Sequence, residues 1–439
     1  MAASSLVAAI PALLLLLLVA FTPAPAAAVS PSKRPTHQPP SFPAGISTLR
    51  QRAASSSGGY ATAAKPYTAH YFPQELDHFT FTPNSSHIFS QKYLLNDTFW
   101  QRKPTVGPLF VYMGGEADIE WLATTTGFMF DIAPEFGVLI VFIEHRFYGE
   151  SKLFGNDSYK SVDMLGYLTS TQALADFAIL ITSLKQNMSI VDAPVVVFSG
   201  SYGGMLASWF RLKYPHVAIG AMASSAPILH FDDITPWCRG LQVREPELLQ
   251  TVQFIYSLSS WLQTAFIHTA TMDYPTPANF LMNLPAYPVK EMCKIIDSFP
   301  AGADVIDKAF AAASLYYNYT GDKKCFQVEG GDDPHGFKGW GWQMVMPMTV
   351  SNESMFRPSS FSYEKMSESC LAGYRVRPRM HWITSEYGGH KIDKVLERFG
   401  SNIIFSNGKR HPWSGGGYSR TYHPPSLLLS RRKGPISWT

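Results

Sequence analysis

Ser201 is the residue whose surroundings point most clearly to chemistry. It lies in SGSYGGML (199–206), between a short apolar run at 193–198 and ASWFRLKYPH (207–216), which has the pattern of an amphipathic helix. A strand, a glycine-rich turn with a central serine and a helix together make a nucleophile elbow. The sharp turn exposes the serine hydroxyl and aims the backbone N–H of Tyr202 at the oxyanion of a tetrahedral intermediate.

Small residues surround Ser201, as this turn requires. Gly203 and Gly204 let the helix start close against the strand, because a Cβ at either position would clash. Position 199 departs from the motif G-x-S-x-G, since a serine stands in place of its first glycine. Serines among glycines also occur in ordinary loops, but the strand before Ser201 and the helix after it favour a nucleophile.

A serine nucleophile needs a histidine base and a carboxylate that orients the base, and in this arrangement both follow the serine along the chain. The late strand predicted at 402–406 runs into an Asn-Gly turn, so the carboxylate is expected at 409–412. That stretch reads KRHP, which puts His411 at the position of the acid. His423 is the only later histidine. Neither partner of Ser201 therefore stands at its expected place.

Two further groups of residues are candidates for the site. Gly114, Gly115 and Glu116 follow an early strand, and Gly115 is expected on the second side of the oxyanion hole. An ordinary strand-to-helix turn is the alternative for this loop. Met205 and Trp413 are expected to line an apolar substrate pocket, with simple core packing as the alternative.

Other polar residues are given structural roles. His145, near a strand end, is expected to make a structural hydrogen bond. Asp232 and Asp233 follow a strand and are expected to cap the next helix. A metal site formed by His411 and His423 has little support, and the cysteine spacing matches no zinc pattern. We expect neither a metal nor a cofactor.

The composition is that of a globular protein. Its 439 residues are 46% apolar and 16% charged, enough for a large core in one domain with an insertion or in two domains. A net charge of +3 is too small to indicate nucleic-acid binding, and part of the basic excess lies in the tail at Arg431, Arg432 and Lys433.

The N-terminus predicts entry into the secretory pathway. Residues 1–28 join a leucine-rich core to a run of small residues, which favours a cleaved signal peptide over a retained membrane anchor. Residues 29–65, rich in Pro, Ser and Ala, are expected to form a propeptide or a disordered lead. Six N-x-S/T sequons fit this route, at Asn84, Asn96, Asn156, Asn187, Asn318 and Asn352. Four cysteines could form two disulfides in one of three pairings: Cys238, Cys293, Cys325 and Cys370.

Strand and helix patterns alternate from residue 66 to residue 228. The runs GPLFVYMGG (107–115) and GVLIVFIEHR (137–146) are short and apolar, which predicts strands buried in a parallel sheet. Residues 169–187 have helical spacing and begin with Thr-Ser capping chemistry. This half is therefore predicted to be α/β.

The alternation stops at residue 229. Residues 229–385 are rich in aromatics and prolines and are predicted to form a mainly helical cap inserted over the sheet. Residues 386–417 resume the strand pattern and are expected to return to the core, and residues 418–439 form an atypical tail.

Six separated blocks carry a resemblance to a known family: EHRFYGES (144–151), LTSTQALADFA (168–178), SGSYGGMLASWFRLKYPH (199–216), MDYPTPANF (272–280), YYNYTGDKKC (316–325) and NIIFSNG with HPWSGGG (402–417). In this order they resemble the lysosomal Pro-X carboxypeptidase family of serine peptidases, which includes dipeptidyl peptidase II. The resemblance covers residues 65–417. It implies an α/β-hydrolase core with a helical cap, with Ser201 as nucleophile, and cleavage beside a proline near a chain end.

The chain departs from this family at the end of the sheet. The family has Asp-Pro-Trp-Ser-Gly-Gly-Gly where this chain reads HPWSGGG (411–417), so the resemblance places His411 at the catalytic aspartate. The family's catalytic histidine falls in SLLLSRRKGPISWT (426–439), which resembles nothing in the family. The cap is also shorter than the family's after Pro236, and the resemblance implies that the last strand of the sheet is missing.

Two functions of different class follow. The resemblance implies a serine exopeptidase, lysosomal, vacuolar or extracellular, that acts on peptides with proline near a terminus. Its partners would be peptides, without nucleic acid and without membrane after signal cleavage, and it could be a homodimer. The alternative is a catalytically impaired or inactive relative, such as a binding protein or the product of an altered transcript, because the triad acid and base are not in place. A generic esterase would need the same base.

Overall fold

The computed structural model describes residues 67–80, 87–232, 234, 253–321, 323, 325–326, 337–343, 362–408, 411–418 and 426–431. The predicted signal and lead, residues 1–65, lie outside them. So do several single residues for which roles are predicted above: Asn84, Asp233, Cys238, Asn352 and His423.

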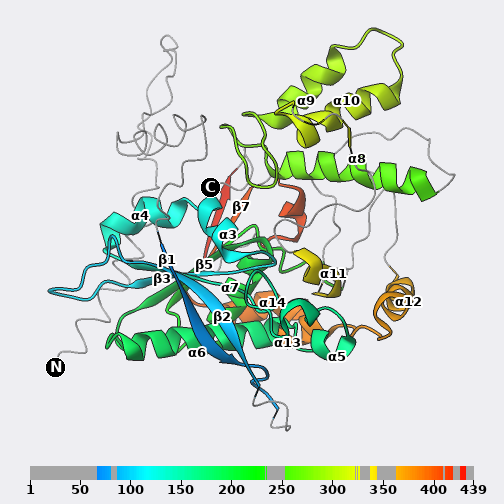
Figure 1. Cartoon of the computed structure of the whole chain (residues 1–439). Coiled ribbons are helices and arrows are strands. Elements are labelled where there is room, and N and C mark those ends of the chain that lie inside the picture. The colour runs from blue at the N-terminus through cyan, green and yellow to red at the C-terminus, as the bar shows by residue number, and fades with distance from the viewer. Residues whose placement is uncertain are drawn as a thin grey trace, which may run out of the picture. The chain divides into compact units, whose positions relative to one another are not determined.

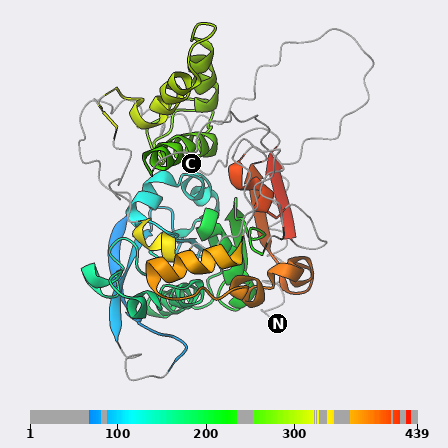
Figure 2. The ribbon, with the colours of Figure 1, turned by 90° about the vertical axis from the view of Figure 1, so that its right-hand side faces the viewer.

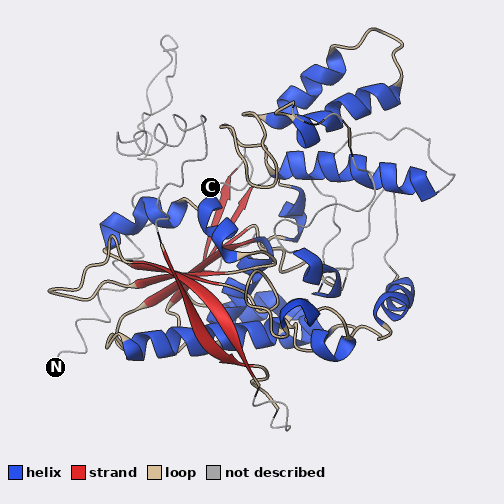
Figure 3. Ribbon diagram, viewed as in Figure 1, coloured by secondary structure: helices blue, strands red, loops and turns tan. Residues whose placement is uncertain are grey.

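An eight-stranded sheet organises the described residues (Figures 1 and 3). The strand order is β1-β2-β4-β3-β5-β6-β7-β8; β2 runs antiparallel to both of its neighbours, and the pairs from β4 to β8 are parallel. The strands are β1 (Thr68–Glu75), β2 (Ile88–Asn96), β3 (Leu109–Met113), β4 (Leu139–Ile143), β5 (Val195–Gly200), β6 (Gly220–Ser224), β7 (Ile403–Gly408) and β8 (Ser426–Arg431).

The central strands are buried on both faces, which explains their continuous apolar sequence. All five residues of β4, LIVFI, are fully buried. Alternate side chains of β3 face opposite cores: Val111 packs with helices α6 (Ser170–Asn187) and α7 (Ser201–Lys213), whereas Phe110 packs with α3 (Ile119–Thr125) and α4 (Phe128–Phe136). The helices therefore cover both faces of the sheet, as the alternation of strand and helix patterns predicts.

Helices from the predicted cap form a separate cluster. The helices α8 (Gln253–Thr271), α9 (Pro288–Asp297) and α10 (Val305–Asn318) pack around Trp261 and Tyr316, and Figure 2 shows them grouped together. The remaining helices are α5 (Val162–Leu165), α11 (Trp340–Gln343), α12 (Tyr363–Tyr374), α13 (Trp382–Glu386) and α14 (Ile392–Phe399). Short 3-10 turns are η1 (Gly155–Asp157), η2 (Phe337–Gly339), η3 (Gly389–Lys391) and η4 (Pro412–Gly416).

The prediction that the last strand is missing is wrong. Residues Ser426–Arg431 form β8, which pairs with β7 in parallel from Ile403↔Ser426 to Gly408↔Arg431. Although this tail resembles nothing in the family, its run SLLLSR is apolar and of strand length, and the edge of β7 offers unpaired backbone groups to such a segment.

The two disulfides that the cysteine count allows are not formed among the described residues. Cys293, Cys325 and Cys370 are free thiols, on α9, after α10 and on α12 respectively. Within the part of the chain that the structure describes, no two cysteines are therefore paired. Among the described helices, none is long and apolar enough to cross a membrane.

Candidate active site

The nucleophile elbow is present at the junction of β5 and α7. Ser201 is the first residue of α7 and has a φ of 54°, in the left-handed region that a non-glycine residue adopts at a cost of about 1–2 kcal/mol. The buried strand before it and the helix after it hold this conformation. Strain of this kind concentrates at catalytic positions, and the predicted strand–turn–helix is confirmed.

The structure explains how a serine fits at position 199. The hydroxyl of Ser199 is buried and donates a hydrogen bond of 2.7 Å to the carbonyl oxygen of Met113, at the end of β3. It occupies the space beside Gly203, where an added Cβ would lie 2.2 Å from the Ser199 Oγ. At Gly204 an added Cβ would lie 3.0 Å from the carbonyl oxygen of Ser224. Both glycines are thus required for the close approach of α7 to the sheet.

The loop after β3 lies against the first turn of α7. An added Cβ at Gly115 would lie 3.4 Å from the backbone nitrogen of Gly203 and 3.9 Å from the ring of Tyr202. The first backbone N–H groups of a helix have no partner within it and carry its positive dipole end. This geometry fits the predicted oxyanion hole of Tyr202 and Gly115, whose role stays a prediction.

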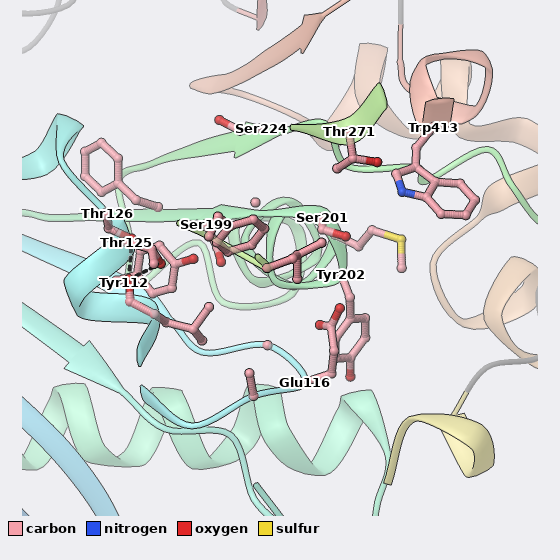
Figure 4. A pocket seen from close by; sticks show the side chains of 18 of the residues that line it. Tyr112, Glu116, Thr125, Thr126, Ser199, Ser201, Tyr202, Ser224, Thr271 and Trp413 are labelled. Atoms are coloured by element: carbon pink, nitrogen blue, oxygen red, sulfur yellow. Dashed lines mark hydrogen bonds between the residues drawn. The ribbon is translucent and has the colours of Figure 1, made fainter. Parts of the chain in front are cut away.

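Ser201 lines a cavity of about 430 Å³ (Figure 4). Its walls come from the carboxyl ends of β5 and β6, from α3, α4 and α7, and from α8 of the cap. Both predicted pocket residues, Met205 and Trp413, line it. Many of the other lining side chains are apolar, among them Leu122, Phe128, Met129, Phe198, Met222, Pro227, Phe280, Leu281 and Trp340.

His145 has the structural role predicted for it. Its Nδ1 lies 2.7 Å from the carbonyl oxygen of Arg146 and must donate there, so Nε2 accepts from the hydroxyl of Tyr202 at 3.1 Å. That hydroxyl in turn accepts a hydrogen bond of 3.0 Å from the side-chain amide of Gln343. Burial lowers the pKa of His145 to about 4, so the ring is neutral at neutral pH.

His411, at the position where the sequence places the acid, lines the cavity together with Trp413. Its side chain is buried, and its Nδ1 accepts a hydrogen bond of 3.3 Å from the backbone N–H of Trp413. Its Nε2 finds no hydrogen-bond partner within the described part of the chain. Burial lowers the pKa of His411 to about 3, so the ring carries no charge near neutral pH. It cannot supply the negative charge by which a carboxylate stabilises a protonated histidine.

The chain is similar to known peptidases over most of its length. Residues 74–243 match the family described as Serine carboxypeptidase S28. The Lysosomal Pro-X carboxypeptidase of Homo sapiens is 38% identical over 408 residues, which cover 81% of this chain and 80% of the human protein. The bovine protein of the same name (Bos taurus) is 38% identical over 93% of this chain and 87% of its own length. The chain belongs to the S28 family of serine carboxypeptidases.

A more distant S28 relative and one solved structure complete the comparison. The Prolyl carboxy peptidase like protein 5 of Caenorhabditis elegans is 35% identical over 83% of this chain and 82% of that protein. A peroxisomal alpha-beta-hydrolase of Saccharomyces cerevisiae aligns with 84% of this chain and 82% of its own, at 9% identity and a TM-score of 0.37. The assignment of an α/β-hydrolase core to this S28 serine peptidase rests on its own strand order and elbow.

The cavity of this S28 chain also contains two titratable groups, Glu116 and His268, that its sequence does not identify as bases. Glu116, partly buried after β3, has its pKa raised to about 7 by burial. His268, from the last turn of α8, lines the same cavity, and its Nδ1 lies 2.8 Å from the hydroxyl of Tyr316. Burial lowers the pKa of His268. Nothing in local sequence spacing places His268 in the same cavity as Ser201, whereas Glu116 could have been found from its position after the early strand.

The structure describes four of the six asparagines that are predicted to carry glycans. Asn156 and Asn187 are exposed, as glycan acceptors must be, and Asn318 is partly buried and bonded to the backbone of Lys323. Asn96 is buried in β2, and its side-chain oxygen accepts a hydrogen bond from the backbone N–H of Thr98. Its buried side chain is therefore not a glycosylation site.

Asp232 contacts residues that are distant from it in the sequence. The next described helix, α8, begins at Gln253, far along the chain. The Asp232 carboxylate accepts hydrogen bonds from the hydroxyls of Tyr363 and Thr384. Residues 235–252 lie outside the described part of the chain, so the predicted capping role stays a prediction.

Proposed function

We propose that this S28 chain binds peptides with a proline near one terminus in the cavity at Ser201, and that it hydrolyses them much more slowly than a peptidase with a complete triad. One observation carries the proposal: an intact nucleophile elbow opens into an apolar cavity beside a neutral His411. The names of the human and bovine relatives, Pro-X carboxypeptidases, support proline as the residue next to the cleaved bond.

The cavity suits a proline ring. Proline offers an apolar ring and no N–H, so a pocket that binds it gains from hydrophobic contact and needs no acceptor for a backbone donor. Met205, Met222 and Trp413 supply such contact. Among the described residues that line the cavity none is a lysine or arginine, so this surface offers no fixed positive charge to a substrate carboxylate.

Slow turnover follows from the groups around Ser201. A serine hydroxyl needs a base to take its proton, and the loss of a working triad costs roughly 10⁶-fold in kcat. The Nε2 of His145 accepts a hydrogen bond from Tyr202, and His411, whose pKa burial lowers to about 3, is a weak base near neutral pH. Glu116 and His268 are the described cavity groups that could act as a substitute base, and neither belongs to a carboxylate–histidine pair in the described residues.

The cellular setting is part of the same proposal. Relatives named as lysosomal and the signal-like residues 1–28 support entry into the secretory pathway, with the lysosome, a vacuole or the extracellular space as destination. Peptides are the expected partners. Self-association into a homodimer is the one assembly we propose to examine, by analytical ultracentrifugation.

Equilibrium binding tests the substrate class. Purified Ser201→Ala protein is titrated with a fluorescent peptide that has proline next to its C-terminal residue, and with the same peptide carrying alanine there. We expect the proline peptide to bind at least about tenfold more tightly, a difference of 1.4 kcal/mol. Repeating the titration with an amidated C-terminus and with an acetylated N-terminus identifies the end that is recognised. Equal binding of the proline and alanine peptides would reject the proposed specificity.

A further inference from the structure

A second cluster of chemically able side chains lies apart from the cavity. In the described part of the chain, Asp232, His381 and His390 are the group of three whose potential ligand atoms all lie within 4.8 Å of one another. The three residues come from separate segments: Asp232 follows β6, His381 immediately precedes α13 and His390 is in η3. None of the three lines the cavity at Ser201.

The geometry of the cluster is close to that of a metal site. The Oδ1 of Asp232 lies 2.8 Å from the Nδ1 of His381, and its Oδ2 lies 2.9 Å from the Nε2 of His390. Around a tetrahedral zinc ion with ligands at about 2.0–2.2 Å, ligand atoms are roughly 3.3–3.5 Å apart. Small side-chain rotations would therefore bring one carboxylate oxygen and two imidazole nitrogens to those spacings.

The Asp232 carboxylate is held in place by the hydroxyl groups of two neighbouring residues. The hydroxyl of Tyr363 donates to Oδ1 of Asp232 and the hydroxyl of Thr384 donates to Oδ2. Such outer hydrogen bonds orient ligating carboxylates and strengthen metal sites.

The cluster is closed on one side and open on the other. The Asp232 side chain is 6% exposed, whereas those of His381 and His390 are 54% and 56% exposed. An ion can therefore enter from solvent past the two imidazoles and meet a fixed carboxylate behind them.

We propose that Asp232, His381 and His390 bind one Zn²⁺ ion, with water as the fourth ligand. Two imidazoles and one carboxylate match the ligand set of zinc, whereas Mg²⁺ and Ca²⁺ prefer oxygen ligands throughout. The role is structural. Asp232 lies where the chain leaves the sheet after β6, and His381 and His390 lie where it returns to the core around α13, so the ion ties these two segments together.

Zinc binding to purified full-length protein tests the proposal. Protein stripped with a chelator is titrated with ZnCl₂ by calorimetry, beside the single variants His381→Gln and His390→Gln. Exposed His216, outside the cluster, provides the control variant His216→Gln. We expect one ion per chain for the unchanged protein and for the control, and an affinity at least about tenfold lower for each cluster variant. Zinc should also raise the Tm of the unchanged protein and of the control, but not of the cluster variants.

The outcome that overturns the proposal is the absence of stoichiometric binding, or equal binding by all four proteins. Should a cluster variant fail to fold, modification of the unchanged protein by diethyl pyrocarbonate decides. Zinc should protect His381 and His390 from the reagent, while His216 continues to react. Equal modification of all three histidines with and without zinc would overturn the proposal.

Discussion

The side-chain amide of Gln343, in α11, donates a hydrogen bond of 3.0 Å to the hydroxyl of Tyr202, the residue that follows Ser201. The same Gln343 accepts a hydrogen bond from the hydroxyl of Tyr148 through its Oε1. Gln343 thus connects a segment distant in sequence to the first turn of α7. Tyr202, whose backbone N–H is the expected oxyanion donor, is therefore held by a hydrogen bond to its side chain as well as by the helix.

Gln343→Ala should loosen this connection. Removal of the amide leaves the Tyr202 hydroxyl without its donor, and we expect a loss of about 1–2 kcal/mol in the free energy of unfolding. Urea denaturation measures it. Gln186→Ala, at an exposed position of α6, is the control and should change stability by less than about 0.5 kcal/mol. Equal stability of the two variants would show that the bond to Tyr202 contributes nothing.

Gly203→Ala should clash with Ser199. The added Cβ would lie 2.2 Å from Ser199 Oγ and 3.0 Å from the carbonyl oxygen of Met113, so we expect a loss of about 1–3 kcal/mol. Adding Ser199→Gly to the same chain should recover part of the loss, because the nearer obstacle is removed. Thermal unfolding of both single variants and the double variant measures the coupling.

Gly373→Ala is the matched control for this cycle. An added Cβ there meets nothing within 4 Å, and the position lies in α12, where alanine is favoured over glycine. Its stability should be unchanged or slightly higher. Strictly additive effects of Ser199→Gly and Gly203→Ala would contradict the proposed steric relationship.

His411 should make stability depend on pH. Its pKa is about 3 in the folded protein and 6.5 as the ordinary value, so the unfolded chain binds more protons between these values. The stability that the neutral ring contributes is complete above pH 6.5 and is lost as the pH falls toward 3. At pH 5 the loss amounts to about 2 kcal/mol.

His411→Asn isolates this effect. Asparagine does not titrate, yet its side-chain oxygen can accept the hydrogen bond from the backbone N–H of Trp413. Urea denaturation at pH 7.5 and pH 5 should show the unchanged protein losing about 2 kcal/mol more than the variant on acidification. Parallel pH profiles of the two proteins would contradict the burial of a neutral His411.

Trp413→Ala should weaken peptide binding, since this ring lines the cavity. We expect a loss of at least about tenfold in affinity for the proline peptide, the scale at which buried aromatic anchors contribute to binding. Phe399→Ala removes an aromatic ring that is 69% exposed on α14 and outside the cavity, and it should leave binding unchanged. Fluorescence titration of both variants makes the comparison. Equal affinities would show that Trp413 does not contact the bound peptide.

The local parts of this site could be predicted from sequence, and the distant ones could not. Strand, turn and helix around Ser201 are contiguous, so periodicity and glycine spacing specify the elbow. His268 and Asp232 meet partners far along the chain, Tyr316 and Thr384. No local pattern encodes such contacts, because tertiary packing decides them. For strand β8 the reason is different. The resemblance implies that this strand is missing because its sequence is unlike the family's, although its apolar content suits an edge strand.

The rate at which a fluorophosphonate labels Ser201 tests the central claim most directly. The reagent reacts with serines that a base has activated, and peptide binding to the same preparation shows that the cavity is formed. We expect the folded protein to bind the proline peptide while its labelling stays at the level of Ser201→Ala. Rapid labelling that disappears in Ser201→Ala would contradict the account, because it would require a working base beside Ser201, with Glu116 and His268 the first residues to replace.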